Sequence, residues 1–168
     1  IVSKSINLKG ETITIPSGST LEFKSKGVMR NGTIVGNETL VKNPNLQQIH
    51  FKGSFANNSL TINDSFDAET DFWNLIKCFP KADISLSKDL TLPVSTVKDL
   101  SVSRFHINGN GHTITVISCP ILRNVDVNIS NIIFDCKNAK EHVIYSLGIN
   151  TENRFIAQNC FFKNVPNR

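Results

Sequence analysis

The chain is poor in the residue types that mark several common kinds of functional site. Its 168 residues include one tryptophan, one tyrosine, one methionine and four cysteines. No two cysteines stand in a CxxC spacing, which argues against a zinc site, and we predict no metal and no cofactor. Cys136 and Cys160 lie about one repeat apart. The sequence leaves two alternatives for them, two buried thiols in neighbouring windings or a disulfide.

Long apolar runs and clustered charges are also missing. No apolar segment approaches the roughly 18–20 residues of a membrane-spanning helix, so we predict no membrane span. The net charge is +4 and the pI is about 9.0, but the basic residues are dispersed, and the densest run is Lys24, Lys26 and Arg30. Because no basic stripe is interleaved with aromatic residues, we predict no nucleic-acid partner. An acidic glycan stays compatible with the charge.

Phenylalanine and asparagine, by contrast, are abundant. The chain has eleven Phe and 20 Asn. Phenylalanine has no polar group and therefore suits a dry interior. Many of the asparagines adjoin strand-like runs, which suits turns in which Asn side chains stack on one another.

The second half of the chain repeats itself. Segment 103–108 recurs as 125–130 and again, after a longer interval, as 153–158. The apolar residues fall at the same places in each copy: Phe105 and Ile107, Val127 and Ile129, Phe155 and Ala157. A repeat built from short alternating strands indicates stacked windings, and the same spacing predicts that Ile114 stacks on Leu92. We therefore predict an all-β fold, a parallel β-solenoid that forms one domain over 1–168, with a longer loop between Asp135 and Asn153.

Short strands also fill the first third of the chain. Leu21, Leu40 and Leu60 follow one another at nearly equal spacing, which predicts a slightly shorter repeat and a column of three leucines. Asn31-Gly32 is also a sequence that favours a tight antiparallel hairpin. A β-sandwich is therefore the rival fold, although it does not account for the repeated register of the second half.

One segment breaks the strand pattern. Within 67–79, apolar residues fall at Phe72, Leu75, Ile76 and Phe79, the stripe of an amphipathic helix. Acidic residues crowd its start, and Pro80 ends it. We expect a capping or side-packed helix in 65–80, between first windings in 1–64 and further windings in 81–168.

These repeats resemble a known family. Segments 108–114, 129–134 and 159–164 are similar to the right-handed parallel β-helix of the pectate lyase-like superfamily. Segments 10–23 and 31–39 resemble the first windings of polysaccharide-degrading β-helix proteins of Bacteroidetes. The resemblance spans most of the chain and implies a single-stranded right-handed parallel β-helix.

The catalytic patterns of that family are not found in this sequence. Its lyases hold calcium with clustered carboxylates beside an arginine or lysine base, and its hydrolases use paired aspartates. This chain has no Asp-Asp pair and no dense acidic cluster. We identify no catalytic motif, and enzyme status stays open, with a polysaccharide lyase or a glycoside hydrolase as the enzyme classes that the resemblance implies.

One constellation follows from the alternation. If Phe105, Val127 and Phe155 point inward, then Arg104, Asp126 and Arg154 point outward in one column, with neighbouring strands about 4.8 Å apart. The column is either an exposed salt-bridge ladder or a strip that binds uronate through the two donors of each guanidinium. His106 faces outward beside it and is a candidate acid or base. Arg104, His106, Asp126 and Arg154 are the predicted substrate-binding residues.

The sequence therefore predicts a polysaccharide-interacting domain with an acidic polysaccharide as partner. The expected location is secreted, periplasmic or at the cell surface. The domain is either a binding module or the front part of a lyase or hydrolase. The alternative is a structural or adhesive stalk of a surface protein or phage-type spike. No cap is recognisable before Arg168, so we expect a truncated end, a short capping turn, or oligomerisation through the uncapped last winding.

Overall fold

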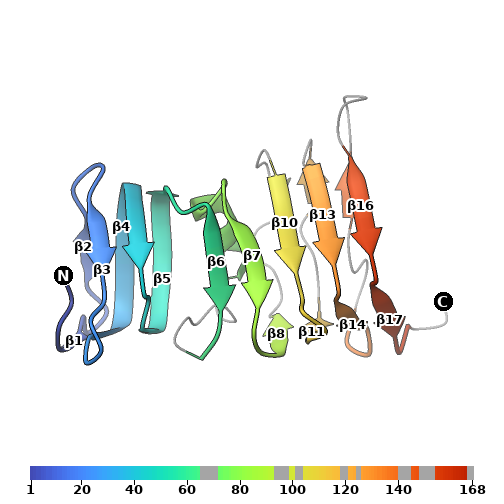
Figure 1. The fold of residues 1–168 in the computed structure, drawn as a ribbon, viewed down its shortest axis with the longest axis horizontal. Coiled ribbons are helices and arrows are strands. Elements are labelled where there is room, and N and C mark those ends of the chain that lie inside the picture. Colours follow the sequence, from blue (N-terminus) through green and yellow to red (C-terminus); the bar gives the residue numbers. More distant parts are fainter. Residues whose placement is uncertain are drawn as a thin grey trace.

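A computed structural model describes residues 1–64, 72–92, 99–100, 104–117, 121–123, 126–139, 145–147 and 154–165. The protein is mostly β, with one helix among these residues, as predicted. The strands follow one another along the long axis in chain order, and the two ends of the chain lie at opposite ends of it (Figure 1). None of the helices in the described residues is long and apolar enough to cross a membrane.

The first half forms one five-stranded sheet around a long central strand. Its strands are β1 (Ser5–Asn7), β2 (Thr12–Thr14), β3 (Thr20–Glu22), β4 (Val28–Lys42) and β5 (Leu46–Phe55). β1, β2 and β3 pair with successive parts of β4, and β5 pairs with β4 as well. Gly53 allows close contact between β4 and β5, because a Cβ on it would lie 2.0 Å from the carbonyl oxygen of Gly36.

The second half forms three sheets in which neighbouring strands are three strands apart in the chain. One sheet runs β6 (Ser59–Ile62), β7 (Asp83–Leu86), β10 (Arg104–Asn108), β13 (Asp126–Ser130) and β16 (Phe155–Gln158). The second runs β8 (Leu90–Leu92), β11 (Thr113–Val116), β14 (Ile133–Asp135) and β17 (Phe161–Lys163). The third runs β9 (Asp99–Leu100), β12 (Ile121–Arg123) and β15 (Tyr145–Leu147). Only β6 and β7 depart from the three-strand step.

Parallel pairing excludes the antiparallel rival among the predicted folds. Every described strand pair is parallel, and Asn31-Gly32 lies inside β4, so no hairpin forms there and the β-sandwich alternative is wrong. In the second half the predicted register is confirmed for the main repeat, since Phe105 pairs with Val127 and Val127 with Phe155. The predicted stacking of Ile114 on Leu92 is wrong, because Ile114 pairs with Leu90.

The predicted leucine column of the first half is also wrong. Leu21 lies opposite Val41, not Leu40, and β6, which carries Leu60, pairs with β7 instead of β4. A side chain closes the β4 ladder at this point. Asn57 accepts a hydrogen bond from the Val41 N–H (2.9 Å) and donates one to the Val41 carbonyl (2.7 Å).

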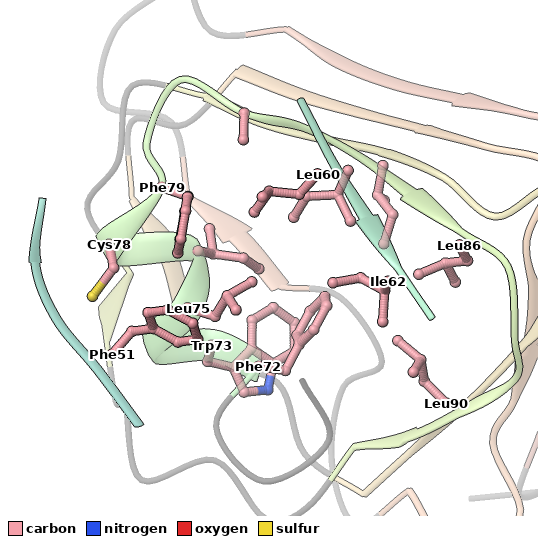
Figure 2. Close-up of a cluster of buried hydrophobic side chains, with 14 of the residues drawn as sticks. Phe51, Leu60, Ile62, Phe72, Trp73, Leu75, Cys78, Phe79, Leu86 and Leu90 are labelled. Atoms are coloured by element: carbon pink, nitrogen blue, oxygen red, sulfur yellow. The ribbon is translucent and has the colours of Figure 1, made fainter. Parts of the chain in front are cut away.

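The helix α1 (Phe72–Cys78) packs between the two halves. The four apolar positions predicted to form its stripe are all buried, and the Asn74 amide donates to the Phe51 carbonyl of β5 (2.6 Å). Figure 2 shows Phe72, Trp73, Leu75 and Phe79 beside Phe51 of β5 and the leucines of the following strands. The predicted helix start at 67–71 and the predicted long loop fall largely outside the described residues. The buried apolar residues form one cluster from Val2 to Cys136.

Asparagine side chains stack at the turn between the first two sheets of the second half. Asn131 donates to the side chain of Asn108 (3.1 Å), and Asn159 donates to that of Asn131 (3.2 Å). Asn131 and Asn159 have positive φ, near 53° and 52°, a conformation that asparagine tolerates better than most residues. The predicted asparagine stacking is confirmed. Cys136 and Cys160 are free thiols, so the disulfide alternative is wrong; Cys136 is buried as the other alternative predicted, but Cys160 is only partly buried.

Candidate functional site

The candidate site lies on the outward face of the sheet that contains β7, β10 and β13. Phe105 and Ile107 of β10 are buried, and the alternation of the strand therefore turns Arg104 and His106 to the opposite face. The parallel register places His106 between Asp83 of β7 and Asn128 of β13. It places Arg104 beside Asp126 in the same way.

Arg104, His106 and two carboxylates form one connected cluster. Nη2 of Arg104 bonds to Oδ1 of Asp83 and lies 3.1 Å from Nδ1 of His106. Nδ1 of His106 is 3.2 Å from the same Asp83 oxygen, and Nε2 is 3.6 Å from Oδ2 of Asp126. If Nδ1 accepts from the guanidinium, the ring proton sits on Nε2 and faces Asp126. The imidazole thus lies between two carboxylates that come from the strands on either side of it.

The cluster is half-open to solvent. The Asp83 side chain is 61% exposed, whereas those of His106 and Asp126 are 26% and 34% exposed. An open depression of about 230 Å³ lies over the strands, lined by Asp83, Ile84, His106, Ile107, Asn108, Asn128 and Ser130. Nε of Arg104 and Nε2 of His106 are buried and have no hydrogen-bond partner among the described residues. The depression itself offers the Asp83 carboxylate, the Asn108 and Asn128 amides and the Ser130 hydroxyl to a polar ligand.

The predicted salt-bridge ladder needs a correction. Arg104 and Asp126 do occupy one column, but the guanidinium pairs with Asp83 on the opposite side. Arg154 directly precedes β16, the strand after β13 in this sheet. Its carbonyl accepts a hydrogen bond from the Val127 N–H (2.8 Å). Within the described ranges no ion pair joins Arg154 to Asp126. The prediction placed Asp126 between two arginines, whereas in the structure His106 lies between Asp83 and Asp126.

Asp83 and Asn128 are the site residues that the sequence prediction missed. The signal for Asp83 was present, because Ile84 and Ile107 lie one repeat apart, which puts Asp83 opposite His106. Asn128 pairs with His106 by the next step of the same repeat. Neither residue type is unusual in a turn-rich β sequence, so only the register identifies them.

Two further acids belong to the neighbouring sheet, Asp89 directly before β8 and Asp135 at the end of β14. Both accept hydrogen bonds from other parts of the protein. Asp89 accepts from the Thr113 N–H (2.8 Å), and this hydrogen bond lowers the pKa of its carboxyl. Asp135 is buried and accepts from the Asn164 amide (3.0 Å), which lowers the pKa of Asp135. Because both carboxylates already accept hydrogen bonds from neighbouring segments of the chain, they are weaker ligand-binding candidates than the Arg104 cluster.

The structure offers no metal centre in the part of the chain that it describes, where no group of three or more His, Cys, Asp or Glu residues is arranged to hold an ion. Comparison of the chain with models of protein families, with curated proteins and with solved structures finds no match in any of the three.

Proposed function

We propose that the chain is a right-handed parallel β-helix, of the kind found in the pectate lyase-like superfamily, that binds acidic polysaccharide outside the cytoplasm. The parallel pairing and the three-strand step between sheet neighbours support the β-helix. A fold of this kind displays a flat outer face along each column of strands, and an extended glycan matches such a face.

The observation that supports glycan binding best is the cluster of Arg104, His106, Asp83 and Asp126 on an exposed sheet face. A guanidinium binds a carboxylate through two parallel donors, so Arg104 and Arg154 suit the carboxylate of a uronate. Asp83, Asp126 and Asn128 suit sugar hydroxyls, which both donate and accept hydrogen bonds. Binding is the role we assign, without a catalytic step.

Isothermal titration with oligogalacturonate, and with an uncharged oligosaccharide of equal length, tests this function. Arg104→Gln removes the charge, and we expect binding of the acidic ligand to weaken about tenfold or more, since a charged hydrogen bond contributes about 1.5–3 kcal/mol. The matched control is Arg30→Gln, which removes an exposed arginine on β4 of the first half.

Binding that is equal for the charged and the uncharged ligand would contradict the uronate assignment. An equal loss in both variants would show that only overall charge attracts the ligand. No binding of either ligand would favour the second function below.

The second candidate function is a structural or adhesive stalk. The observation that favours it is a group of exposed phenylalanines on the last strands, Phe155, Phe161 and Phe162, which are 51%, 69% and 46% exposed. A stalk that associates through this edge would form oligomers in light scattering and would bind no oligogalacturonate.

A further inference from the structure

The outer edge of β6 is unpaired among the described residues, because β6 is the last strand of its sheet. Its other edge bonds to β7, where the Asp83 N–H donates to the Asn58 carbonyl (2.9 Å) and the Ser87 N–H donates to that of Ile62 (3.0 Å). Consecutive strand residues direct their backbone groups to opposite sides. The N–H and C=O groups of Ser59 and Thr61 therefore point away from β7.

The facing strand does not use these groups. On the edge opposite β3, the last backbone groups of β4 are those of Val41, whose N–H and C=O are both bonded to the side chain of Asn57. Asn57 is only 7% exposed, so this closure is part of the folded interior. As a result, β4 and β6 lie on two sides of a gap instead of pairing.

The gap is a groove of about 580 Å³. Its lining comes from Leu40, Val41, Lys42, Asn43, Pro44, Asn57, Asn58, Ser59, Leu60, Thr61 and Asn63. Lys42 is the one charged residue in this lining. Glu22, its neighbour on β3, bonds to Lys24 (2.6 Å) and attracts Lys42 only at longer range, and no ion pair of Lys42 is found within the described residues. The groove therefore favours an occupant that carries a negative charge.

We propose that this groove binds an extended, acidic peptide segment of another protein, which adds to β6 as a new edge strand. Its backbone pairs with Ser59 and Thr61, whose groups repeat at the strand spacing of about 6.6 Å per two residues. An acidic side chain of the peptide lies near Lys42, and an apolar one contacts the half-buried Leu40. A peptide fits better than a glycan, because only a polypeptide presents donors and acceptors at this repeat.

The test uses a synthetic peptide, acetylated at its N-terminus, that copies residues 19–23 of the β3 segment and thus keeps Glu22 without Lys24, because in the native sheet this segment places Glu22 beside Lys42. Amide exchange is followed by NMR on the whole protein. In the free protein we expect the Thr61 amide to exchange much faster than the Ile62 amide. Saturating peptide should slow the Thr61 amide at least tenfold and leave the Ile62 amide unchanged.

Two variants of one position give the matched control. Thr61→Pro removes the N–H that the peptide needs, at an edge position where proline is tolerated, whereas Thr61→Val keeps it. Fluorescence anisotropy of the labelled peptide should show saturable binding to the Val variant and none to the Pro variant. If Thr61→Pro does not fold, as judged by far-UV circular dichroism, Lys42→Glu replaces it and should weaken binding at least threefold.

Three results would overturn the proposal: an unchanged Thr61 exchange rate at saturating peptide, equal binding by the Pro and Val variants, or equal binding by Lys42→Glu and the unaltered protein. Protection of the Thr61 amide by oligogalacturonate but not by the peptide would also overturn it and assign the groove to a glycan. The glycan titration of the Arg104 variants is independent of all these outcomes.

Discussion

Asp135 is the one charged side chain among the described residues that is buried. It accepts hydrogen bonds from the Asn164 amide (3.0 Å) and the Lys137 N–H (3.2 Å), and the ammonium groups of Lys137 and Lys163 each lie 3.8 Å away. These contacts favour the ionised form, and the hydrogen bond from Asn164 is the main cause of the lowered pKa.

This arrangement gives a pH-dependent prediction. Because the pKa of Asp135 is lower in the folded protein than in the unfolded chain, its carboxylate stabilises the fold above the ordinary aspartate pKa of about 3.9. That contribution disappears as the pH falls through the folded-state pKa. Asp135→Asn should therefore reduce the free energy of unfolding at pH 7, and the difference from the unaltered protein should shrink towards pH 3. Urea unfolding at both pH values measures this, and a difference at pH 3 as large as that at pH 7 would contradict it.

Asn131 allows the stacking of amides to be separated from backbone strain. Asn131→Ala removes both amide contacts, at a cost of about 1 kcal/mol for each lost hydrogen bond. It also places alanine at positive φ, where the side chain can no longer hydrogen-bond locally and the strained backbone costs about 1–2 kcal/mol. Asn131→Gly loses the contacts but fits the φ angle.

We expect the Ala variant to be less stable than the Gly variant, and both to be less stable than the unaltered protein. Thermal unfolding by circular dichroism measures the order. Equal stability of the unaltered protein and the Gly variant would show that the amide contacts contribute nothing.

At the residue level, the sequence predicted which side chains face outward but not which of them meet. Arg104, His106 and Asp126 were found because the Phe-x-Ile alternation assigns them to one face. Arg104 pairs with Asp83 and not with Asp126 because of the direction in which its side chain extends over the neighbouring strand. The sequence repeat gives the position of each residue but not that direction.

Among the elements, the seven-residue helix α1 contributes an unusually large share of buried apolar side chains. Five of them are buried, and Leu75 is 1% exposed. An isolated helix of this length is not stable in water, so the helix exists because its apolar face packs against β5 and the strands that follow.

Leu75→Ala should therefore lower the free energy of unfolding by about 2–5 kcal/mol, the usual range for a buried leucine. The matched control is Lys77→Ala, an exposed position on the same helix, for which we expect a change below about 0.5 kcal/mol. Chemical denaturation measures both changes, with the same dependence of the unfolding free energy on denaturant concentration assumed for all variants. Similar losses of unfolding free energy in the two variants would mean that α1 is not part of the folded core.

The stripe of α1 was predictable because four apolar residues at helical spacing outweigh local strand preference. The end of the β4 ladder was not predictable. Asn57 belongs to an Asn-Asn-Ser run that is typical of a turn, and nothing in the sequence distinguishes an amide in solvent from one that bonds both backbone groups of Val41.

For the whole molecule, the continuity of the core predicts cooperative unfolding. The apolar cluster extends from the first strands through α1 to Cys136, so no described part has a core of its own. Trp73, the single tryptophan, is 6% exposed beside Phe105 and reports on the junction of the halves.

We expect the unfolding midpoint from Trp73 fluorescence to coincide with the midpoint from far-UV circular dichroism, as for a two-state domain. The buried cysteines Cys78 and Cys136 give a third probe through their reaction with a thiol reagent. A fluorescence transition that precedes the loss of β structure would show that the halves unfold separately.

The register of the second half has a consequence for how such a chain changes length. Arg104 pairs with Asp126 and His106 with Asp83, so each strand of β10's sheet meets only the strands one period before and one period after it. A tandem duplication or loss of one whole repeat would leave every other pairing intact, whereas a single-residue gain or loss inside a strand would turn its apolar side chains to solvent. Genes for such chains can therefore lengthen or shorten in whole modules, while small insertions are confined to the turns.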